Sequence, residues 1–146
     1  MLKNWNKPRC PEEEELLTRL KAARERLTVQ QMQIKEKKLP VLVLFEGWGA
    51  AGKGSVLGKV IRNIDPRFFQ VATMGKPTEE EARKPFLYRY FVQIPEAGKF
   101  RFLDGGWMDE ITQSVLYEKT DEEHYKERIE SVRRFERQLT DNGYLV

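Results

Sequence analysis

The feature that most constrains this chain is an apolar segment that leads directly into a glycine-rich loop. Residues 39–45 are continuously apolar and rich in β-branched side chains, as is typical of a strand buried on both faces of a sheet. The loop that follows reads Gly47-x-x-x-x-Gly52-Lys53, and apolar residues at helical spacing begin after Ser55. A strand, a tight loop and a helix in this order indicate a unit of a parallel α/β sheet.

The same loop has the spacing of a phosphate-binding P-loop. Glycines let several backbone N–H groups converge on one phosphate, and the N-terminus of the next helix adds its positive dipole. Lys53 would reach the outer phosphates as a mobile cation. The alternative, a glycine-rich turn without a ligand, leaves the lysine and the spacing unexplained. The predicted phosphate-binding residues of the loop are Gly47, Gly49, Ala50, Ala51, Gly52, Lys53, Gly54 and Ser55.

A carboxylate for a metal ion is expected at the end of a later strand. Residues 99–103 alternate as a strand does, and Asp104 follows them in the place of a Walker B aspartate, which would hold Mg²⁺ directly or through water. A role as a turn or helix-cap residue before Gly105 is equally open. The Ser or Thr that usually follows the loop lysine and binds Mg²⁺ is replaced by Gly54, with Ser55 one position later.

Composition excludes several other classes of protein. Apolar residues make up 40% of the 146 residues, and no apolar run approaches the roughly 20 residues needed to span a bilayer. The net charge of +3, from 26 basic and 23 acidic side chains, does not indicate nucleic-acid binding. A single cysteine, Cys10, excludes an intrachain disulfide and a multi-cysteine metal site. With no secretory signal pattern, we expect a cytoplasmic protein.

The order of the predicted elements gives the domain organisation and the fold class. We expect an irregular arm over residues 1–10, a charged helix over 11–38, and an α/β domain over 39–146. Within that domain we expect helices over 55–64, from Thr78 onward with a break at Pro85, and over 108–117. A last helix should open at Thr120 with Glu123 as its capping-box partner and end at Asn142-Gly143. With strands near 70–74, 99–103 and 144–146, the fold is predicted to be a three-layer sandwich around a parallel sheet.

Several segments along the chain match a known family in order and spacing. They are Leu42-Val43-Leu44-Phe45-Glu46-Gly47-x-x-Ala50-Ala51-Gly52-Lys53-Gly54, Asp65-Pro66-Arg67, residues 76–81, Phe86-Leu87-Tyr88-Arg89, Ile94-Pro95-x-x-Gly98, Asp104-x-x-Trp107, and Phe135-Glu136-x-x-Leu139-x-x-x-Gly143. With these segments the sequence resembles the polyphosphate kinase 2 family over about residues 10–146. In this family a glycine typically follows the loop lysine, as Gly54 does here.

The resemblance implies a P-loop kinase-like fold and phosphoryl transfer between inorganic polyphosphate and a nucleotide such as AMP, with Mg²⁺ as cofactor. By the same resemblance Lys53 would stabilise the transferred phosphoryl group and Asp104 would bind the metal, so these two are the expected catalytic residues. The candidates for contacting the polyphosphate chain are Arg67, Lys76 and Arg89. We expect the C-terminal strand and the lid helices that follow it in the family to be truncated, and either a fused second domain or a homo-oligomer as a partner.

Two departures from the family pattern leave two functional hypotheses. The family loop usually carries an aspartate where this chain has Gly49, and the family motif Asp-Arg-Ser-Trp-Tyr is Asp104-Gly105-Gly106-Trp107-Met108 here. Loss of an arginine that stabilises phosphoryl transfer can cost on the order of 10³ in rate. The first hypothesis is a working phosphotransferase, which the retained Lys53 and Asp104 support. The second is a catalytically degenerate P-loop domain for anion binding, structural support or oligomerisation, and the glycines favour it for this chain alone.

Overall fold

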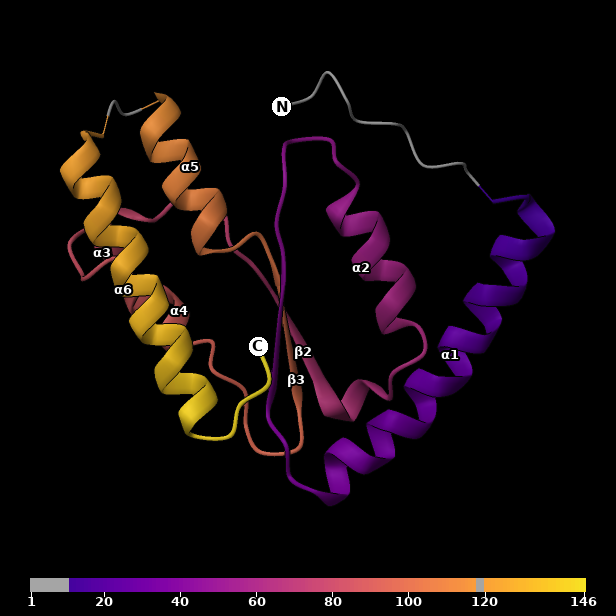
Figure 1. The fold of residues 1–146 in the computed structure, drawn as a ribbon. Coiled ribbons are helices and arrows are strands. Elements are labelled where there is room, and N and C mark those ends of the chain that lie inside the picture. The colour runs from indigo at the N-terminus through magenta and orange to yellow at the C-terminus, as the bar shows by residue number, and fades with distance from the viewer. Residues whose placement is uncertain (1–10, 118–119) are drawn as a thin grey trace.

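Three parallel strands form the centre of the computed structural model, which describes residues 11–117 and 120–146. They are β1 (Val41–Phe45), β3 (Phe100–Asp104) and β2 (Phe69–Thr73), in that spatial order (Figure 1). The helices are α1 (Glu13–Glu36), α2 (Lys53–Ile61), the 3-10 turn η2 (Pro66–Phe68), α3 (Glu79–Ala82), α4 (Tyr88–Phe91), α5 (Trp107–Tyr117) and α6 (Glu122–Asp141). The parallel sheet that the sequence predicts is confirmed.

Helices cover both faces of the sheet, so the predicted three-layer architecture is also confirmed. Figure 1 shows α1 and α2 on one face of the sheet and α4, α5 and α6 on the other. On β3, Phe102 packs with residues of α1 and α2, whereas Leu103 packs with residues of α4, α5 and α6. Helices on both faces also explain why β1, with Val41 in one core cluster and Leu42 in the other, reads as a continuous apolar run. One core cluster contains Val41, Leu57, Ile64, Phe100 and Phe102. The other contains Leu42, Tyr90, Leu103, Trp107, Ile111, Val132, Phe135 and Leu139.

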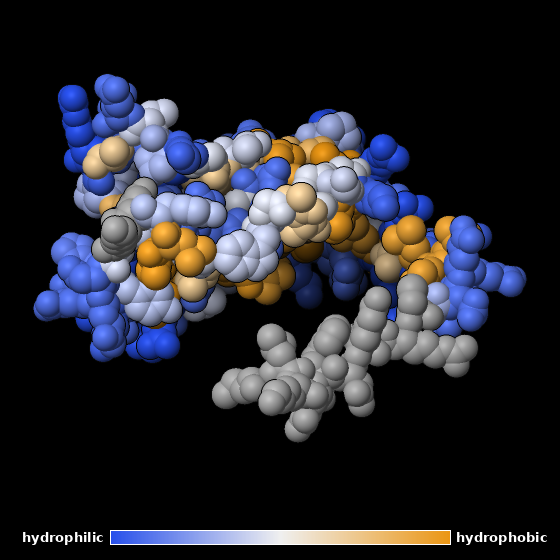
Figure 2. Space-filling model, turned by 90° about the horizontal axis from the view of Figure 1, so that it is seen from above, coloured by the Kyte–Doolittle hydropathy of each residue, from blue (hydrophilic) through white to orange (hydrophobic). Residues whose placement is uncertain are grey.

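The first helix packs on the sheet over only part of its length. Leu27 and Ile34 join the core beside α2, but Leu16 and Leu20, which continue the same helical spacing toward the N-terminus, are 43% and 40% exposed. A helix of 24 residues is about 36 Å long, about twice the length of a five-residue strand, so it extends beyond the sheet. Figure 2 shows apolar surface at this end of the molecule, where Leu17 is also exposed.

The helix boundaries follow local capping rules, with one correction. Thr78 and Glu81 form the predicted capping box, with distances of 3.2 and 2.9 Å between side-chain oxygen and backbone nitrogen. The prediction that Thr120 caps the last helix is wrong. The Thr120 hydroxyl donates to the Ser114 carbonyl, and Asp121, an equally good capping residue, accepts from the His124 N–H at 2.8 Å.

The C-terminal residues return to the sheet beside β1. Gly143 adopts a left-handed φ of +81° after α6, and the Tyr144 N–H donates to the Leu139 carbonyl, which forms a Schellman cap. Leu145 then pairs with Val41 in a parallel bridge. Its N–H donates to the Pro40 carbonyl, and its carbonyl accepts from the Leu42 N–H. The predicted strand over residues 144–146 is thus present as one bridge, on the free side of β1.

No helix within the described residues is long and apolar enough to span a membrane.

The core should be sensitive to a cavity in the middle of the sheet. Leu103 is fully buried, so Leu103→Ala should lower the free energy of unfolding by about 3 kcal/mol, measured by urea denaturation. Leu17→Ala is the matched control, because Leu17 is 59% exposed and its truncation should change stability by less than about 0.5 kcal/mol. Equal losses in the two variants would contradict the two-cluster core.

Candidate phosphate-binding site

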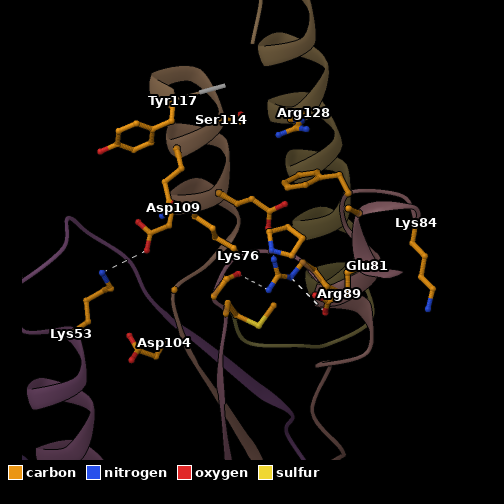
Figure 3. A pocket seen from close by; sticks show the side chains of 18 residues that line it. Lys53, Lys76, Glu81, Lys84, Arg89, Asp104, Asp109, Ser114, Tyr117 and Arg128 are labelled. Atoms are coloured by element: carbon orange, nitrogen blue, oxygen red, sulfur yellow. Dashed lines mark hydrogen bonds and ion pairs between the residues drawn. The ribbon is translucent and has the colours of Figure 1, made fainter. Parts of the chain in front are cut away.

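The carboxyl ends of the three strands lie level with one another, and the site is built at this edge. In the register of the sheet, Asp104 is opposite both Phe45 and Thr73. The segments after β1, β2 and β3 therefore begin side by side, as in other open parallel sheets, where ligands bind at this edge. A cavity of about 770 Å³ opens here between the segments after β2 and β3, α5 and α6, and Lys53 and Asp104 line it on the β1 side (Figure 3).

The glycine-rich loop takes a conformation that leaves the start of α2 uncapped by any side chain. Gly52 is the N-cap residue of α2 with a left-handed φ of +85°, and no side chain caps its backbone N–H groups in the part of the chain that the structure describes. Ala50 is also left-handed, with φ of +62°, and the Ala51 N–H donates to the Trp48 carbonyl to close a turn. An uncapped helix N-terminus preceded by such a loop suits an anion.

Lys53 lies folded back over the loop that precedes it. Its Nζ donates to the Gly47 carbonyl at 2.6 Å and to the Trp48 carbonyl at 3.3 Å. The same ammonium lies 3.9 Å from Oδ2 of Asp109, in the first turn of α5 (Figure 3). The other oxygen of Asp109, Oδ1, accepts from the Gly47 backbone N–H at 2.9 Å.

Asp109 is the site residue that sequence reasoning missed. Acidic residues in the first turn of a helix are common because they interact favourably with the helix dipole, so Asp109 carried no separate signal. Only the fold shows that its carboxylate reaches the glycine-rich loop, 62 residues earlier in the chain.

Asp104 stands where a metal-binding carboxylate is expected. Its Oδ2 lies 3.7 Å from the position that a Cβ on Gly54 would occupy, so it faces the first turn of α2. Lys53 and Asp104 line the same cavity, as the sequence predicts for the two expected catalytic residues. Mg²⁺ is usually bound through one or two carboxylates together with substrate phosphates, and the half-buried carboxylate of Asp104, which faces the start of α2, fits that donor set. The described residues contain no ready-made cluster of three metal-ligating side chains.

The structure brings Lys76 and Arg89 to the cavity but not Arg67. Arg67 precedes β2, at the opposite end of the sheet from the loop, and its guanidinium pairs with Asp65 at 2.6 Å. That pair holds the pKa of Asp65 down to about 2. Two further basic residues that line the cavity, Lys84 and Arg128, come from α3–α4 and α6.

Arg89 is buried beneath the cavity and carries its own acidic partners. It is 6% exposed, and its guanidinium donates to the Gly75 carbonyl at 2.7 Å and to Glu110 at 3.3 Å. The Tyr90 hydroxyl donates to the same Glu110 oxygen at 2.9 Å. Burial raises the pKa of Glu110, against the opposing effect of its contacts with Tyr90 and Arg89. Arg89 therefore shapes the floor of the cavity, and much of its charge is balanced there.

The two glycines after Asp104 are required by close packing. Gly105 has a left-handed φ of +95°, and a Cβ on it would lie 3.0 Å from the Met74 carbonyl oxygen. A Cβ on Gly106 would collide with the carboxylate of Glu46. Glu46 needs that space because its Oε1 accepts from the Met108 N–H at 2.9 Å, at the start of α5. The Gly-Gly pair thus belongs to an arrangement in which Glu46 anchors α5.

Glu46→Gln should flatten the pH dependence of stability. Burial raises the pKa of Glu46 above its ordinary value of 4.5. Between the unfolded and folded pKa values the folded chain binds more protons than the unfolded chain, so this group lowers stability as the pH rises through that interval. Urea unfolding between about pH 4 and pH 8 should show the wild type losing stability relative to E46Q as the pH increases.

Glu80→Gln is the control with the opposite sign. The contact with Lys84 lowers the pKa of Glu80, so its contribution is present above the ordinary pKa of 4.5 and is lost as the pH falls. A difference between wild type and E46Q that stayed constant with pH would contradict the burial of an ionised Glu46.

Comparison with known proteins identifies the family. The family model of polyphosphate kinase 2 matches residues 11–146. A polyphosphate:AMP phosphotransferase of Pseudomonas syringae is 33% identical over 110 residues, which is 75% of this chain and 22% of the relative. NDP-polyphosphate phosphotransferase 3 of Ruegeria pomeroyi is 34% identical over 113 residues, 77% of this chain and 38% of the relative. The chain thus spans well under half the length of these two relatives.

Solved structures agree with the sequence matches. A polyphosphate kinase 2 structure from Pseudomonas aeruginosa superposes with a TM-score of 0.87 and 25% identity, over 99% of this chain and 32% of that one. A polyphosphate kinase 2 structure from Arthrobacter aurescens gives a TM-score of 0.78 and 27% identity, over 86% of this chain and 46% of that one. With a family match over nearly its whole length, the chain belongs to the polyphosphate kinase 2 family.

Proposed function

We propose that this chain is a phosphate-binding domain of a polyphosphate–nucleotide phosphotransferase, with weak or absent phosphoryl transfer of its own. The observation that carries the proposal is that an uncapped P-loop helix, Lys53 and Asp104 meet at one cavity, while the two residues after Asp104 are glycines that packing requires. Relatives named for AMP and for nucleoside diphosphates support polyphosphate and a nucleotide as ligands. Such substrates suit the predicted cytoplasmic location.

Binding needs only groups that this chain supplies. The N–H groups at the start of α2 and the Lys53 ammonium offer donors and positive charge to one phosphate. Lys76, Lys84 and Arg128 line the rest of the cavity and would attract further phosphates of an extended anion. Asp104 would hold Mg²⁺, which when bound neutralises charge that develops between the reacting phosphates.

Transfer places a stricter demand on the same cavity. It requires cations arranged around the moving phosphoryl group, in positions that stabilise charge as it develops. Here acidic side chains accompany two of the cations that line the cavity, with Asp109 beside Lys53 and Glu110 beside Arg89. Gly105, which faces the cavity, contributes no side chain at all. These features favour binding over catalysis, and they support a role beside a fused second domain or in a homo-oligomer.

An active phosphotransferase is the second candidate, because Lys53 and Asp104 are both retained at the cavity. The two candidates differ in what an activity assay would show.

Polyphosphate should raise the melting temperature of the chain, since it would bind only the folded state. The shift should shrink in Lys53→Ala and weaken with added salt, as expected for an electrostatic contact. Lys59→Ala is the matched control, because Lys59 is an exposed lysine in the last turn of the same helix. An absence of any shift at low salt, or identical shifts in K53A and K59A, would refute phosphate binding at the loop.

Phosphoryl transfer from polyphosphate to AMP should be negligible with Mg²⁺ present. The rate of ADP formation, measured by chromatography, should stay far below about one turnover per second, which is the lower end of the usual range for kinases. Lys53→Ala gives the background rate, since it removes the loop cation. Turnover near one per second that disappears in K53A would establish the second candidate instead.

A further inference from the structure

We propose that Asp109 is an internal competitor for phosphate, whose carboxylate engages the Gly47 N–H and the Lys53 ammonium when no ligand is bound, while the N–H groups at the start of α2 stay uncapped. This inference rests on the proposed function, because it concerns the same loop. The two oxygens of Asp109 are engaged separately, Oδ1 by the Gly47 N–H at 2.9 Å and Oδ2 by Lys53 Nζ at 3.9 Å. A loop N–H and the loop lysine are the kinds of donor that a bound phosphate would use.

The surroundings of this contact strengthen it relative to an ordinary surface pair. The side chains of Lys53 and Asp109 are only 22% and 19% exposed, so solvent screens them less than exposed charges. Figure 3 shows the ammonium of Lys53 and the carboxylate of Asp109 pointing toward one another at the cavity. A phosphate that took these donors would have to displace the Asp109 carboxylate, since two anions at one position repel each other.

Asp109 can leave the loop without disturbing the helix that carries it. The backbone at the start of α5 is held by Glu46, whose Oε1 accepts from the Met108 N–H. The anchor of α5 is therefore independent of the Asp109 side chain, which can rotate away while the helix stays in place.

Competition of this kind lowers the affinity of every phosphate ligand that must displace the Asp109 carboxylate, so binding depends on the further contacts that the ligand makes. Inorganic phosphate offers the loop one small anion in exchange for a carboxylate that is already bound, so its net gain is small. A polyphosphate chain places one phosphate at the loop and others near Lys76, Lys84 and Arg128, which line the same cavity. Those additional contacts are available only to an extended anion. Asp109 thus lowers the affinity for both ligands, and only a polyphosphate chain has the additional contacts that compensate for this loss.

The test is calorimetric titration of the whole chain with inorganic polyphosphate, and separately with inorganic phosphate, in EDTA at low salt. Asp109→Asn removes the charge but keeps an oxygen that can accept from Gly47. Removing one charge-assisted contact that must be broken before binding should tighten polyphosphate binding about tenfold. Inorganic phosphate should gain by about the same factor, because it must displace the same carboxylate. Glu25→Gln is the matched control, an exposed charge removed from α1 on the other face of the sheet, and should leave both affinities unchanged.

Each outcome is decisive for the inference. Equal affinities for wild type and D109N, weaker binding by D109N, or equal gains in D109N and E25Q would each overturn it. Asp109→Ala, with its melting temperature measured without ligand, provides a second test should D109N fold poorly. Binding by wild type that Lys53→Ala abolishes but D109N leaves unchanged overturns the competitor and keeps the proposed function. Binding by D109N but not by wild type supports the competitor and overturns binding by the native chain, and binding by no variant overturns both.

Discussion

Parallel pairing of β3 with both β1 and β2 brings every part of the candidate site together. Because all three strands run in one direction and in level register, Phe45, Thr73 and Asp104 end at the same edge of the sheet. The loop with Lys53, the segment with Lys76 and the start of α5 all continue from that edge. The two apolar clusters on either face hold the strands in this register, since a one-residue slip would exchange the faces of Phe102 and Leu103. The charged residues that line the cavity are therefore positioned by two core clusters to which none of them belongs.

Glu46 fixes the start of α5, the helix whose Asp109 contacts the glycine-rich loop. It directly follows β1, and its carboxylate fixes the first turn of α5 through the Met108 N–H. The cost is a carboxylate whose burial raises its pKa, and a Gly106 position without room for a side chain. Held in this way, α5 presents Asp109 to the loop and Glu110 to Arg89. Positive charge at the cavity is thus partly balanced by acidic side chains of the chain itself.

Local patterns in the sequence predicted most of the fold, and they failed where tertiary contacts decide. The run over residues 41–45, the capping box of Thr78 and the cap at Gly143 are local signals, and each is present in the structure. Arg67 illustrates the limit, because its charge was visible in the sequence but its place at the far end of the sheet was not. Likewise, the sequence could not show that Asp109 reaches Gly47, since that contact depends on how α5 is docked. In the sequence, Gly105 and Gly106 stand out only because they lack the side chains of the family motif. The packing around Met74 and Glu46 shows why there is little room for a side chain at either position.

The competition between Asp109 and phosphate is tested most directly by a crystal structure of this chain grown with inorganic polyphosphate. We expect density for a phosphate group within hydrogen-bonding distance of Lys53 and the backbone N–H groups of residues 47–54. The Asp109 carboxylate should then be turned away from Gly47, with the Glu46 contact to the start of α5 unchanged. A structure at saturating polyphosphate in which Asp109 still accepts from Gly47, with the anion bound elsewhere or absent, would contradict it.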